Sequence, residues 1–515
     1  MQKFNTTLLA ILDGWGIAEA GEGNPISEKT APNYFSLLKK YPNTKLAASG
    51  EDVGLFKGQE GNSEAGHLNL GAGRVVKQDA AYISDAIKDG TFFKNNAFFQ
   101  ALHHVKKYNT AVHLMGLLSN HNSAHSCPEH LRALLDLFHS QRIKQVYLHL
   151  FTDGRDSGQH DAPQHLKKLE EYFHGNEKVA TIMGRYYAMD RNKEWDRTKK
   201  AYEAIVLGKG CASANAQEAL VQSYNRGDTD EFICPSVIIN NNKPVGTLQD
   251  NDAVFFFNLR SDRARQLTKS FVQTNFKEMN HESFARQKFP KNIRFVALSD
   301  FGPDLPGVLT AFPSRDVENG LAQALCPRSQ LYIAESEKFA HITYFLNGGY
   351  VQHFCDEKWV KIESPKAKNY ADKPEMSAKQ IADYLIGAIE SRQYEFIAVN
   401  FANSDMMGHT GNFLAAKIAV SAIDREIGRV LKTIIKYDGQ AIITADHGNI
   451  ENMINEKTGE LDTEHSTSPV PFILVNSKVK CPRKLPEGKL ANVAPTILKI
   501  MGIQKPLEMT AKSLV

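Results

Sequence analysis

Short apolar runs alternate with segments of helical spacing along most of the chain. Residues 6–12 form a nearly continuous apolar run, which Asp13 and Gly14 end. Such a run predicts a buried strand of a parallel sheet, with functional residues at its carboxyl end. Residues 31–40 have helical spacing, and the Tyr-Pro-Asn sequence that follows stops the predicted helix.

Other apolar runs of similar length predict further strands. They cover residues 111–118, 145–151, 179–183, 253–257, 395–401, 440–444 and 470–475. A helix is predicted over residues 131–138, between the first two of these strands. Because strands alternate with helices, we expect an α/β fold of mostly parallel sheets flanked by helices.

The middle of the chain is expected to form an inserted domain. A length of 515 residues suffices for two or more domains with full cores. Residues 301–313, which are rich in proline, are interpreted as a linker. If Asp13 and Ser63 share a site with residues 405–465, the two chain ends belong to one domain and the middle to another.

Composition excludes several classes of function. Hydrophobic residues make up 42% of the chain, charged residues 23%, and the formal net charge is only +3, so neither nucleic acid nor membrane is expected as the main partner. The six cysteines are scattered without a Cys-x-x-Cys pair, which argues against a disulfide framework or a thiolate zinc site. The first apolar run is too short for a signal peptide core or a membrane span. We therefore expect a cytoplasmic protein.

A glycine-rich stretch at residues 59–73 carries a single hydroxyl between two glycines. Ser63 stands between Gly61 and Gly66, with small or polar neighbours. Glycine permits the backbone angles and the close approach that a turn facing a substrate needs. The stretch is informative only together with partners elsewhere in the chain, since glycine-rich turns often merely connect elements.

Carboxylates and imidazoles occur where other apolar runs stop, and they predict a metal site. Asp405 and His409 are four residues apart, a spacing that puts both on one face of a helix. The remaining candidates are Asp13, Asp446, His447 and His465. This oxygen and nitrogen set without thiolate favours Mn²⁺, and Zn²⁺ and Mg²⁺ remain open. Two ions could share it, one activating the Ser63 hydroxyl and one polarising a phosphoryl oxygen.

Arginines follow three successive predicted strands in the middle of the chain. They are Arg155, Arg185, Arg191, Arg260 and Arg263. Guanidinium groups bind phosphate and carboxylate bidentately, so the pattern predicts a small dianion or trianion as substrate. Asp156 and His125 are expected to join them, Lys338 is a weaker candidate by itself, and His121 is interpreted as incidental.

These motifs together resemble those of cofactor-independent phosphoglycerate mutase, a family of the alkaline phosphatase superfamily, and the resemblance covers essentially the whole chain. They begin with Leu12-Asp13-Gly-Trp-Gly16, Gly61-Asn-Ser63-Glu-Ala-Gly-His67, Asp153-Gly-Arg155-Asp156 and Gly184-Arg185-Tyr-Tyr-Ala-Met-Asp190-Arg191. They continue with Arg260-Ser-Asp-Arg263, Glu337-Lys338, Asp405-Met-Met-Gly-His409 and Thr444-Ala-Asp446-His447-Gly-Asn449.

The resemblance implies a ligand set and domain boundaries. One ion would be held by Asp405, His409 and His465, and a second by Asp13, Ser63, Asp446 and His447. A metal-binding, phosphatase-like domain would comprise residues 1–77 and 309–515, and an inserted phosphotransferase domain residues 78–308. The expected cofactors are two Mn²⁺ ions per chain, without 2,3-bisphosphoglycerate, and a monomer is expected.

The resemblance also implies a mechanism that interconverts 3-phosphoglycerate and 2-phosphoglycerate. Ser63 would take the phosphoryl group and return it to the other hydroxyl of the glycerate. Asp156 would act as general acid and base, with Arg155, Arg185 and His125 holding the glycerate. The charge on the phosphoryl group would be neutralised by Lys338, Arg191, Arg260 and Arg263.

The chain departs from the family pattern in one loop. The family usually has Ser-Asp-Gly-Gly-Val-His-Ser, whereas residues 119–126 here read Ser-Asn-His-Asn-Ser-Ala-His-Ser, one residue longer. His125 still falls at the position of the family's histidine. After Arg191, Asn192 and Glu194 replace the usual Asp and Arg, a change that we expect to leave the chemistry intact.

Other functions remain open at this point. A phosphopentomutase or a metal-dependent phosphomonoesterase would share the metal set, although the arginines favour a small substrate that bears a carboxylate. A sensor that binds a phosphometabolite without turnover would explain arginines and metals, but not a serine shared with a metal.

Overall fold

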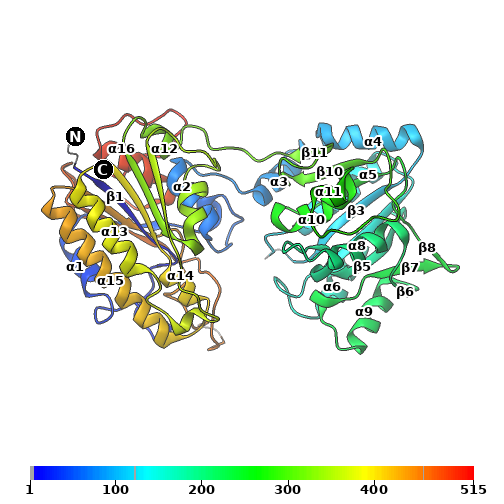
Figure 1. Ribbon diagram of the computed structural model, residues 1–515, viewed down its shortest axis with the longest axis horizontal. Coiled ribbons are helices and arrows are strands. Elements are labelled where there is room, and N and C mark those ends of the chain that lie inside the picture. Colours follow the sequence, from blue (N-terminus) through cyan, green and yellow to red (C-terminus); the bar gives the residue numbers. More distant parts are fainter. Residues whose placement is uncertain (1–4, 121–122, 456–457) are drawn as a thin grey trace. The chain divides into compact units, whose positions relative to one another are not determined.

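The computed structural model describes residues 5–120, 123–455 and 458–515. The chain divides into two compact units (Figure 1). The first comprises Met1–Gln78 and Arg315–Val515, and the second comprises Asp79–Ser314. Both chain ends therefore build one unit, and the middle of the chain builds the other.

The first unit contains an eight-stranded sheet in the order β13-β12-β14-β1-β15-β16-β2-β17. Its strands are β1 (Thr7–Leu12), β2 (Asn43–Ala47), β12 (Gln330–Glu335), β13 (Glu357–Ile362), β14 (Phe396–Phe401), β15 (Gln440–Thr444), β16 (Val470–Val475) and β17 (Gly488–Lys489). β1 is central and parallel to β14 and β15, while β16 is antiparallel to both of its neighbours. Every residue of β1 is buried, as its continuous apolar sequence predicts.

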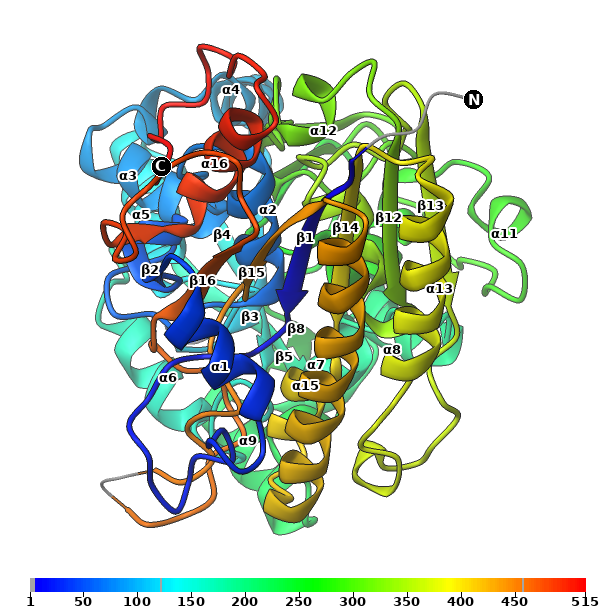
Figure 2. The same ribbon diagram turned by 90° about the vertical axis from the view of Figure 1, so that its left-hand side faces the viewer.

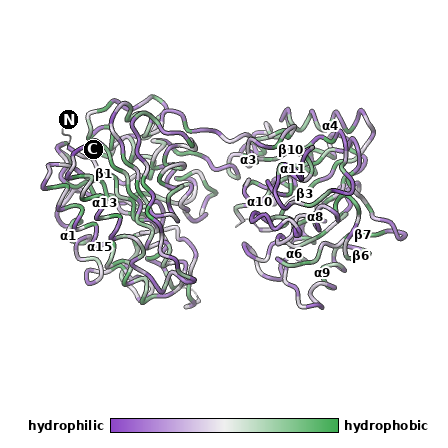
Figure 3. Tube along the Cα trace, in the orientation of Figure 1, coloured by the Kyte–Doolittle hydropathy of each residue, from purple (hydrophilic) through white to green (hydrophobic). Residues whose placement is uncertain are grey.

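Helices cover both faces of this sheet (Figures 1 and 2). On one face lie α1 (Pro32–Lys40), α13 (Ala378–Ser391) and α15 (Phe413–Lys436). On the other lie α2 (Ser63–Ala72), α12 (Leu321–Ala324) and α16 (Val493–Ile500), and α14 (Asn403–Gly408) follows β14. Hydrophobic residues gather along the strands between these layers, as Figure 3 shows.

The second unit contains a nine-stranded sheet in the order β11-β10-β9-β3-β4-β5-β7-β6, with β8 paired to β7. Its strands are β3 (Val112–Leu118), β4 (Val146–Thr152), β5 (Glu177–Gly184), β6 (Cys211–Ser213), β7 (Ser236–Asn240), β8 (Lys243–Pro244), β9 (Ala253–Phe256), β10 (Arg294–Ser299) and β11 (Val308–Phe312). Leu118 pairs with Thr152, and Thr152 pairs with Gly184, so β3, β4 and β5 end side by side.

The helices of this unit connect its strands. They are α3 (Asp79–Lys88), α4 (Asn96–Tyr108), α5 (Pro128–Ser140), α6 (Ala162–Glu170), α7 (Arg185–Ala188), α8 (Trp195–Leu207), α9 (Ala216–Asn225), α10 (Ser261–Val272) and α11 (Phe276–Met279). α5 begins three residues before the predicted start at 131, because Pro128 suits the first turn of a helix, where its missing N–H costs nothing. The predicted α/β fold with mostly parallel sheets is confirmed.

Two predictions from the sequence are wrong in part. Residues 301–313 are not simply a linker, because Val308–Phe312 form the edge strand β11, parallel to β10. Pro306 and Pro313 flank this strand, so neither removes a hydrogen bond from it. The scattered cysteines argue against a disulfide framework, and they give no sign of the disulfide that Cys326 and Cys355 form. Their Cα atoms lie 5.8 Å apart although 29 residues separate them, a proximity that local spacing cannot reveal.

Within the described part of the chain, none of the helices combines the length and the apolar character that crossing a membrane would require.

Candidate catalytic site

The carboxyl ends of the parallel strands in the first unit bring a group of polar side chains together. Leu12 pairs with Phe401, and Ile11 pairs with Thr444, so β1, β14 and β15 end at one level. Asp13 follows β1 directly, Asp446 follows β15 after one residue, and Asp405 lies in α14 just after β14. Three carboxylates distant in sequence thus converge because of strand register.

Two glycines allow the backbone to come this close. Gly14 has a φ of +72°, and a Cβ atom there would lie 2.7 Å from the Cα of Asp405. At Gly66, a Cβ atom would lie 2.4 Å from the carbonyl oxygen of Asp446. Side chains larger than hydrogen would therefore push α14 and α2 away from the carboxylates.

Ser63 lies at the first turn of α2, facing these groups. The Asn62 side chain caps the helix by accepting a hydrogen bond from the Ala65 N–H. The Ser63 Oγ lies 2.9 Å from His447 Nε2, 2.8 Å from Lys338 Nζ and 3.4 Å from Asp13 Oδ1. A buried hydroxyl thus meets an imidazole, an ammonium group and a carboxylate.

Lys338 is the buried cation of this cluster. Its Nζ lies 2.7 Å from Asp13 Oδ1 and 2.6 Å from Asp405 Oδ2. Burial opposes the charge, but the attraction of Asp13 and Asp405 outweighs it and raises the pKa of Lys338 above its ordinary value. Burial opposes the charge on Asp13 and Asp405 as well, but the ammonium group of Lys338 outweighs it and lowers the pKa of both carboxyls, so all three groups are ionised near neutral pH.

Three histidines direct one nitrogen each toward the carboxylates. The Nδ1 atoms of His409, His447 and His465 lie 2.8, 3.2 and 2.9 Å from the carbonyl oxygens of Thr463, Gly448 and Gly61. A carbonyl oxygen only accepts hydrogen bonds, so each Nδ1 carries the hydrogen. In the neutral imidazole, the Nε2 lone pair then faces the cluster, as in a histidine that ligates a metal.

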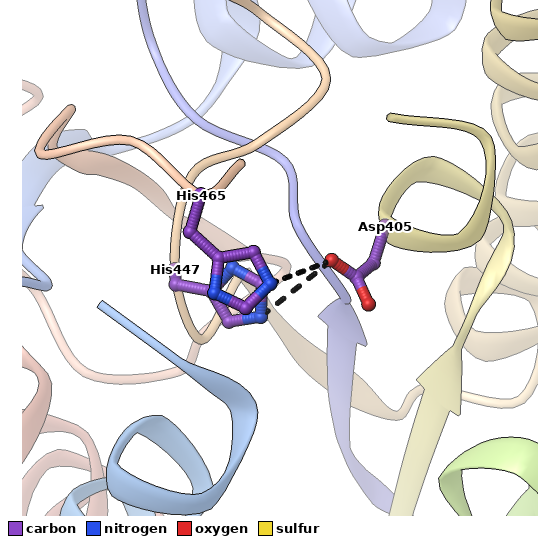
Figure 4. A group of neighbouring side chains, drawn as sticks. All are labelled: Asp405, His447 and His465. Atoms are coloured by element: carbon purple, nitrogen blue, oxygen red, sulfur yellow. Dashed lines mark ion pairs between the residues drawn. The ribbon is translucent and has the colours of Figure 1, made fainter. Parts of the chain in front are cut away.

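The geometry supports metal binding at two overlapping groups. Ligand atoms of Asp405, His447 and His465, and those of Asp13, Asp446 and His447, lie within 4.8 Å of one another. Figure 4 shows the imidazoles of His447 and His465 directed at the Asp405 carboxylate. His409 Nε2 lies 3.3 Å from Asp405 Oδ1 and 3.1 Å from His465 Nε2. Asp446 Oδ2 is buried, lies 3.1 Å from His67 Nδ1 and 3.5 Å from His447 Nε2, and accepts no well-formed hydrogen bond from the described residues, which suits an oxygen that ligates a cation.

Among these histidines, His447 has its pKa raised most strongly by the neighbouring carboxylates. Burial lowers its affinity for a proton, but Asp446 and Asp13 outweigh this effect and raise the pKa of His447 to about 10. The carboxylates thus stabilise a positive charge at this position. Either a proton on Nε2 or a divalent cation bound to Nε2 can supply it, so the two compete for the same nitrogen.

The arginine cluster lies in the second unit, where β3, β4 and β5 end. Arg185 Nη1 lies 2.5 Å from Asp153 Oδ1 and 3.1 Å from Asp156 Oδ2, and the Ser123 hydroxyl donates to Asp156 Oδ2 at 2.7 Å. Burial disfavours charge on Asp156, but Arg185 and Ser123 outweigh it and lower the pKa of this carboxyl. Asp156 is therefore held as a carboxylate.

A cavity of about 210 Å³ adjoins these groups. Its guanidinium groups belong to Arg155, Arg185, Arg191, Arg197 and Arg263. Four of these five arginines are predicted from the sequence. The fifth predicted arginine, Arg260, stands at the N-cap of α10 and does not line this cavity. The positive lining and the small volume suit a compact anion.

His125 lies in the same unit and is buried. Burial, reinforced by Arg185, lowers the pKa of His125 to about 4, so its imidazole is neutral near pH 7. Two serines of the longer loop still reach the cluster, because the hydroxyls of Ser119 and Ser123 donate hydrogen bonds to Asp153 and Asp156. His121, which the sequence marks as incidental, lies outside the described residues.

Several residues at these sites are absent from the sequence prediction. Arg197 stacks over the Tyr186 ring at 4.0 Å, and Glu231 holds Arg155 by contacts of 2.6 Å to Nε and 2.5 Å to Nη2. In the first unit, the Asn449 side chain donates to Asp405 Oδ1 at 2.9 Å. Asn400 donates to Asp13 Oδ2 at 2.6 Å. The sequence marks Asn400 as a polar residue inside the apolar run at 395–401, whereas nothing in the sequence marks Arg197.

The structure thus gathers the predicted site residues in two groups. Asp13, Ser63, Lys338, Asp405, His409, Asp446, His447 and His465 meet in the first unit. Arg155, Arg185, Arg191 and Arg263 line the cavity in the second unit, where His125 and Asp156 lie beside Arg185.

Known proteins resemble the chain over its whole length. The sequence model of the family described as "BPG-independent PGAM N-terminus (iPGM_N)" matches residues 83–302. A 2,3-bisphosphoglycerate-independent phosphoglycerate mutase of Methanosarcina barkeri is 48% identical, covering 98% of each chain. One of Acetivibrio thermocellus is 43% identical, covering 100% of this chain and 99% of that protein.

A solved structure is similar as well. Leishmania mexicana phosphoglycerate mutase, crystallised at low cobalt concentration, matches with a TM-score of 0.78 and 27% sequence identity. The match covers 99% of this chain and 97% of that chain.

Proposed function

Because this chain belongs to the family of 2,3-bisphosphoglycerate-independent phosphoglycerate mutases, which are isomerases, we propose that it interconverts 3-phosphoglycerate and 2-phosphoglycerate through a phosphoserine at Ser63. The observation that carries the proposal is the environment of Ser63. Its hydroxyl lies 2.9 Å from His447 Nε2 and 2.8 Å from Lys338 Nζ, beside two buried carboxylates. A sensor that only binds its ligand has no use for such an activated hydroxyl.

Two divalent ions belong to this proposal. Asp405, His409 and His465 would hold one, and Asp13, Ser63, Asp446 and His447 the other. When bound, the ions lower the pKa of the serine hydroxyl and neutralise charge on the phosphoryl oxygens. The oxygen and nitrogen donors favour Mn²⁺, with Zn²⁺ and Mg²⁺ as alternatives. The hydrogen bonds from the Nδ1 atoms of His409, His447 and His465 to backbone carbonyl oxygens support the binding of two ions, because they leave the Nε2 lone pair of each neutral imidazole available as a ligand.

The chain's own groups carry out two phosphoryl transfers. The Ser63 oxygen forms a bond to phosphorus as the bond between phosphorus and the substrate oxygen breaks. The freed glycerate oxygen gains a proton, and the other hydroxyl loses one as it attacks the phosphoserine. Asp156 is the group proposed to take the proton from the attacking hydroxyl and to give it to the freed glycerate oxygen, so that it begins and ends as a carboxylate. Lys338 supplies positive charge beside Ser63 throughout.

The second unit is proposed to bind the glycerate part of the substrate. Arg155, Arg185 and His125 would hold its carboxylate and hydroxyls, and the phosphoryl charge would be met by Arg191, Arg260 and Arg263. The first unit would then be the metal-binding, phosphatase-like domain and the second the phosphotransferase domain. We expect the enzyme to act as a monomer in the cytoplasm.

An assay coupled to enolase tests this proposal. The wild type is expected to convert 3-phosphoglycerate without added 2,3-bisphosphoglycerate, to lose activity after exhaustive chelation and to regain it with Mn²⁺. Ser63→Ala should lose turnover almost entirely, because it has no oxygen to accept the phosphoryl group. Ser140→Ala, at the end of α5, is the matched control and should keep full activity. Normal turnover in Ser63→Ala would refute the mechanism, and release of inorganic phosphate alone would identify a phosphomonoesterase.

A further inference from the structure

A fully buried polar pair lies behind Ser63, formed by His67 of α2 and Asn400 of β14. We propose that these two side chains position three ligands of the ion that would share Ser63, and thereby set the affinity of that ion alone. The inference rests on the two-ion part of the proposed function. Neither residue touches the phosphoryl group in the proposal, so both are positioning residues.

Asn400 fixes one oxygen of Asp13. Its Nδ2 lies 2.6 Å from Asp13 Oδ2 and 2.9 Å from His67 Nε2. A carboxylate oxygen only accepts hydrogen bonds, so the amide must turn its NH₂ group, and not its oxygen, toward Asp13. The second amide hydrogen is then directed at His67. Asp13 Oδ2 is thus occupied, while Oδ1 faces the Ser63 Oγ at 3.4 Å and His447 Nε2 at 3.5 Å.

The amide in turn fixes the tautomer of His67. Because Nε2 accepts a hydrogen from Asn400, the imidazole hydrogen resides on Nδ1. This Nδ1 lies 2.9 Å from the carbonyl oxygen of Ser63 and 3.1 Å from Asp446 Oδ2. His67 therefore holds the first turn of α2, which carries Ser63, and at the same time lies in contact with Asp446 Oδ2.

The other oxygen of Asp446 is held by the backbone. Oδ1 accepts hydrogen bonds from the N–H groups of Gly14 at 3.2 Å and His447 at 3.1 Å. Asp13, Ser63 and Asp446 are consequently joined in one network that presents one oxygen of each carboxylate to the cluster. Groups that orient metal ligands in this way contribute about 10- to 100-fold to metal affinity or activity.

The ligands proposed for the other ion have different supports. His409 bonds to the Thr463 carbonyl, His465 bonds to the Gly61 carbonyl, and Asp405 accepts from Asn449. Loss of the His67–Asn400 pair should therefore weaken one ion and spare the other. A merely structural role would weaken both ions through general loosening of the fold, and this difference makes the inference testable.

The experiment is a titration of the metal-stripped full-length protein with Mn²⁺, in which free Mn²⁺ is measured by electron paramagnetic resonance. The wild type should bind two ions. His67→Leu removes the contacts of Nδ1 to the Ser63 carbonyl and to Asp446, and Asn400→Leu removes the amide while keeping a side chain of similar size. Each variant should keep one ion at wild-type affinity and bind the second about 10- to 100-fold more weakly. His67→Asn keeps an N–H close to the position of Nδ1 and should lose less.

Two backgrounds identify the weakened ion. With His409→Ala, only the ion next to Ser63 should remain tightly bound, and adding His67→Leu should weaken it. With Asp446→Asn, the remaining ion should be insensitive to His67→Leu. Asn449→Leu is the matched control, because it removes an amide of the same kind from the other ion's ligand, Asp405, and should give the opposite selectivity.

Thermal unfolding of the stripped proteins shows whether each variant is folded, and His67→Asn serves if His67→Leu is not. Wild-type affinity for both ions in His67→Leu and Asn400→Leu, equal weakening of both ions, or a wild type that binds fewer than two ions would overturn the inference. The titration needs no phosphoglycerate. An inactive wild type with selective ion loss in the variants would therefore refute the proposed reaction and leave this inference intact.

Discussion

At the scale of single residues, buried charge dominates the first unit. Lys338, Asp13 and Asp405 form ion pairs with side chains at most 5% exposed. Removing water from charged groups is costly, and such an arrangement persists only where each charge has a partner. The carboxylates of this cluster are therefore stable only beside cations, and the ammonium group of Lys338 supplies one positive charge even without a bound metal.

Glu335 is a buried acid at the end of β12, and burial, with no cation to oppose it, governs the pKa of this carboxyl. Burial raises the pKa of Glu335 to about 7, so the folded state binds its proton more tightly than the unfolded state does. The stabilisation is complete below the ordinary pKa of 4.5 and is lost as pH rises through 7. The free energy of unfolding of the wild type, relative to Glu335→Gln, should fall by about 3 kcal/mol over this interval, at about 1.36 kcal/mol per pKa unit.

Denaturant unfolding at pH 4.5 and pH 8 measures this difference. A difference for Glu335→Gln that is the same at both pH values would contradict the assignment.

At the scale of elements, the close approach of β1 and α14 places Asp13 beside Asp405. Gly14 makes this approach possible, since a Cβ atom there would lie 2.7 Å from the Asp405 backbone. Gly58 has a similar φ of +76° with open space around it, so it separates backbone strain from steric clash.

Gly14→Ala should be considerably more destabilising than Gly58→Ala. Both substitutions place alanine in the left-handed region, at about 1–2 kcal/mol, but only Gly14→Ala also forces the two elements apart, at about 1–3 kcal/mol more. Urea unfolding measures both variants, and a Mn²⁺ titration should show weaker binding only in Gly14→Ala. Equal losses of stability would show that α14 yields without cost.

The sequence predicts the elements and site residues well where one feature of the sequence, the end of an apolar run, marks both the end of a strand and a functional residue. Asp13 and Asp446 stand where buried strands stop, so the end of an apolar run identifies them. His67, Glu231 and Arg197 escape prediction because their roles come from contacts between segments far apart in sequence, such as His67 with Asn400. β11 is missed because the prolines that flank this edge strand resemble those of a linker.

At the scale of the whole molecule, the chain separates two kinds of chemistry. The metal-binding groups and the nucleophile lie in the unit built from the two chain ends. The groups suited to a small anion lie in the unit built from the middle of the sequence. Strand register within each unit assembles its own group, so the two can be altered independently.

Asp156→Asn tests this separation. It keeps the shape of the side chain but removes the proton acceptor, so turnover should fall by about 10²- to 10⁴-fold. The Mn²⁺ content should stay at the wild-type value, because the proposed ligands all belong to the other unit. The coupled assay and metal analysis of the same sample measure both quantities. Wild-type turnover, or loss of the ions, would remove Asp156 from the proposed role.

The central claim is that Ser63 carries the phosphoryl group between the two hydroxyls of the glycerate. The most direct measurement is acid quenching of the Mn²⁺-loaded enzyme shortly after mixing with 3-phosphoglycerate, followed by intact-mass analysis and peptide mapping. The account predicts one added phosphoryl group, located on Ser63 and absent from Ser63→Ala. A phosphoryl group on another residue, or full turnover by Ser63→Ala, would contradict it.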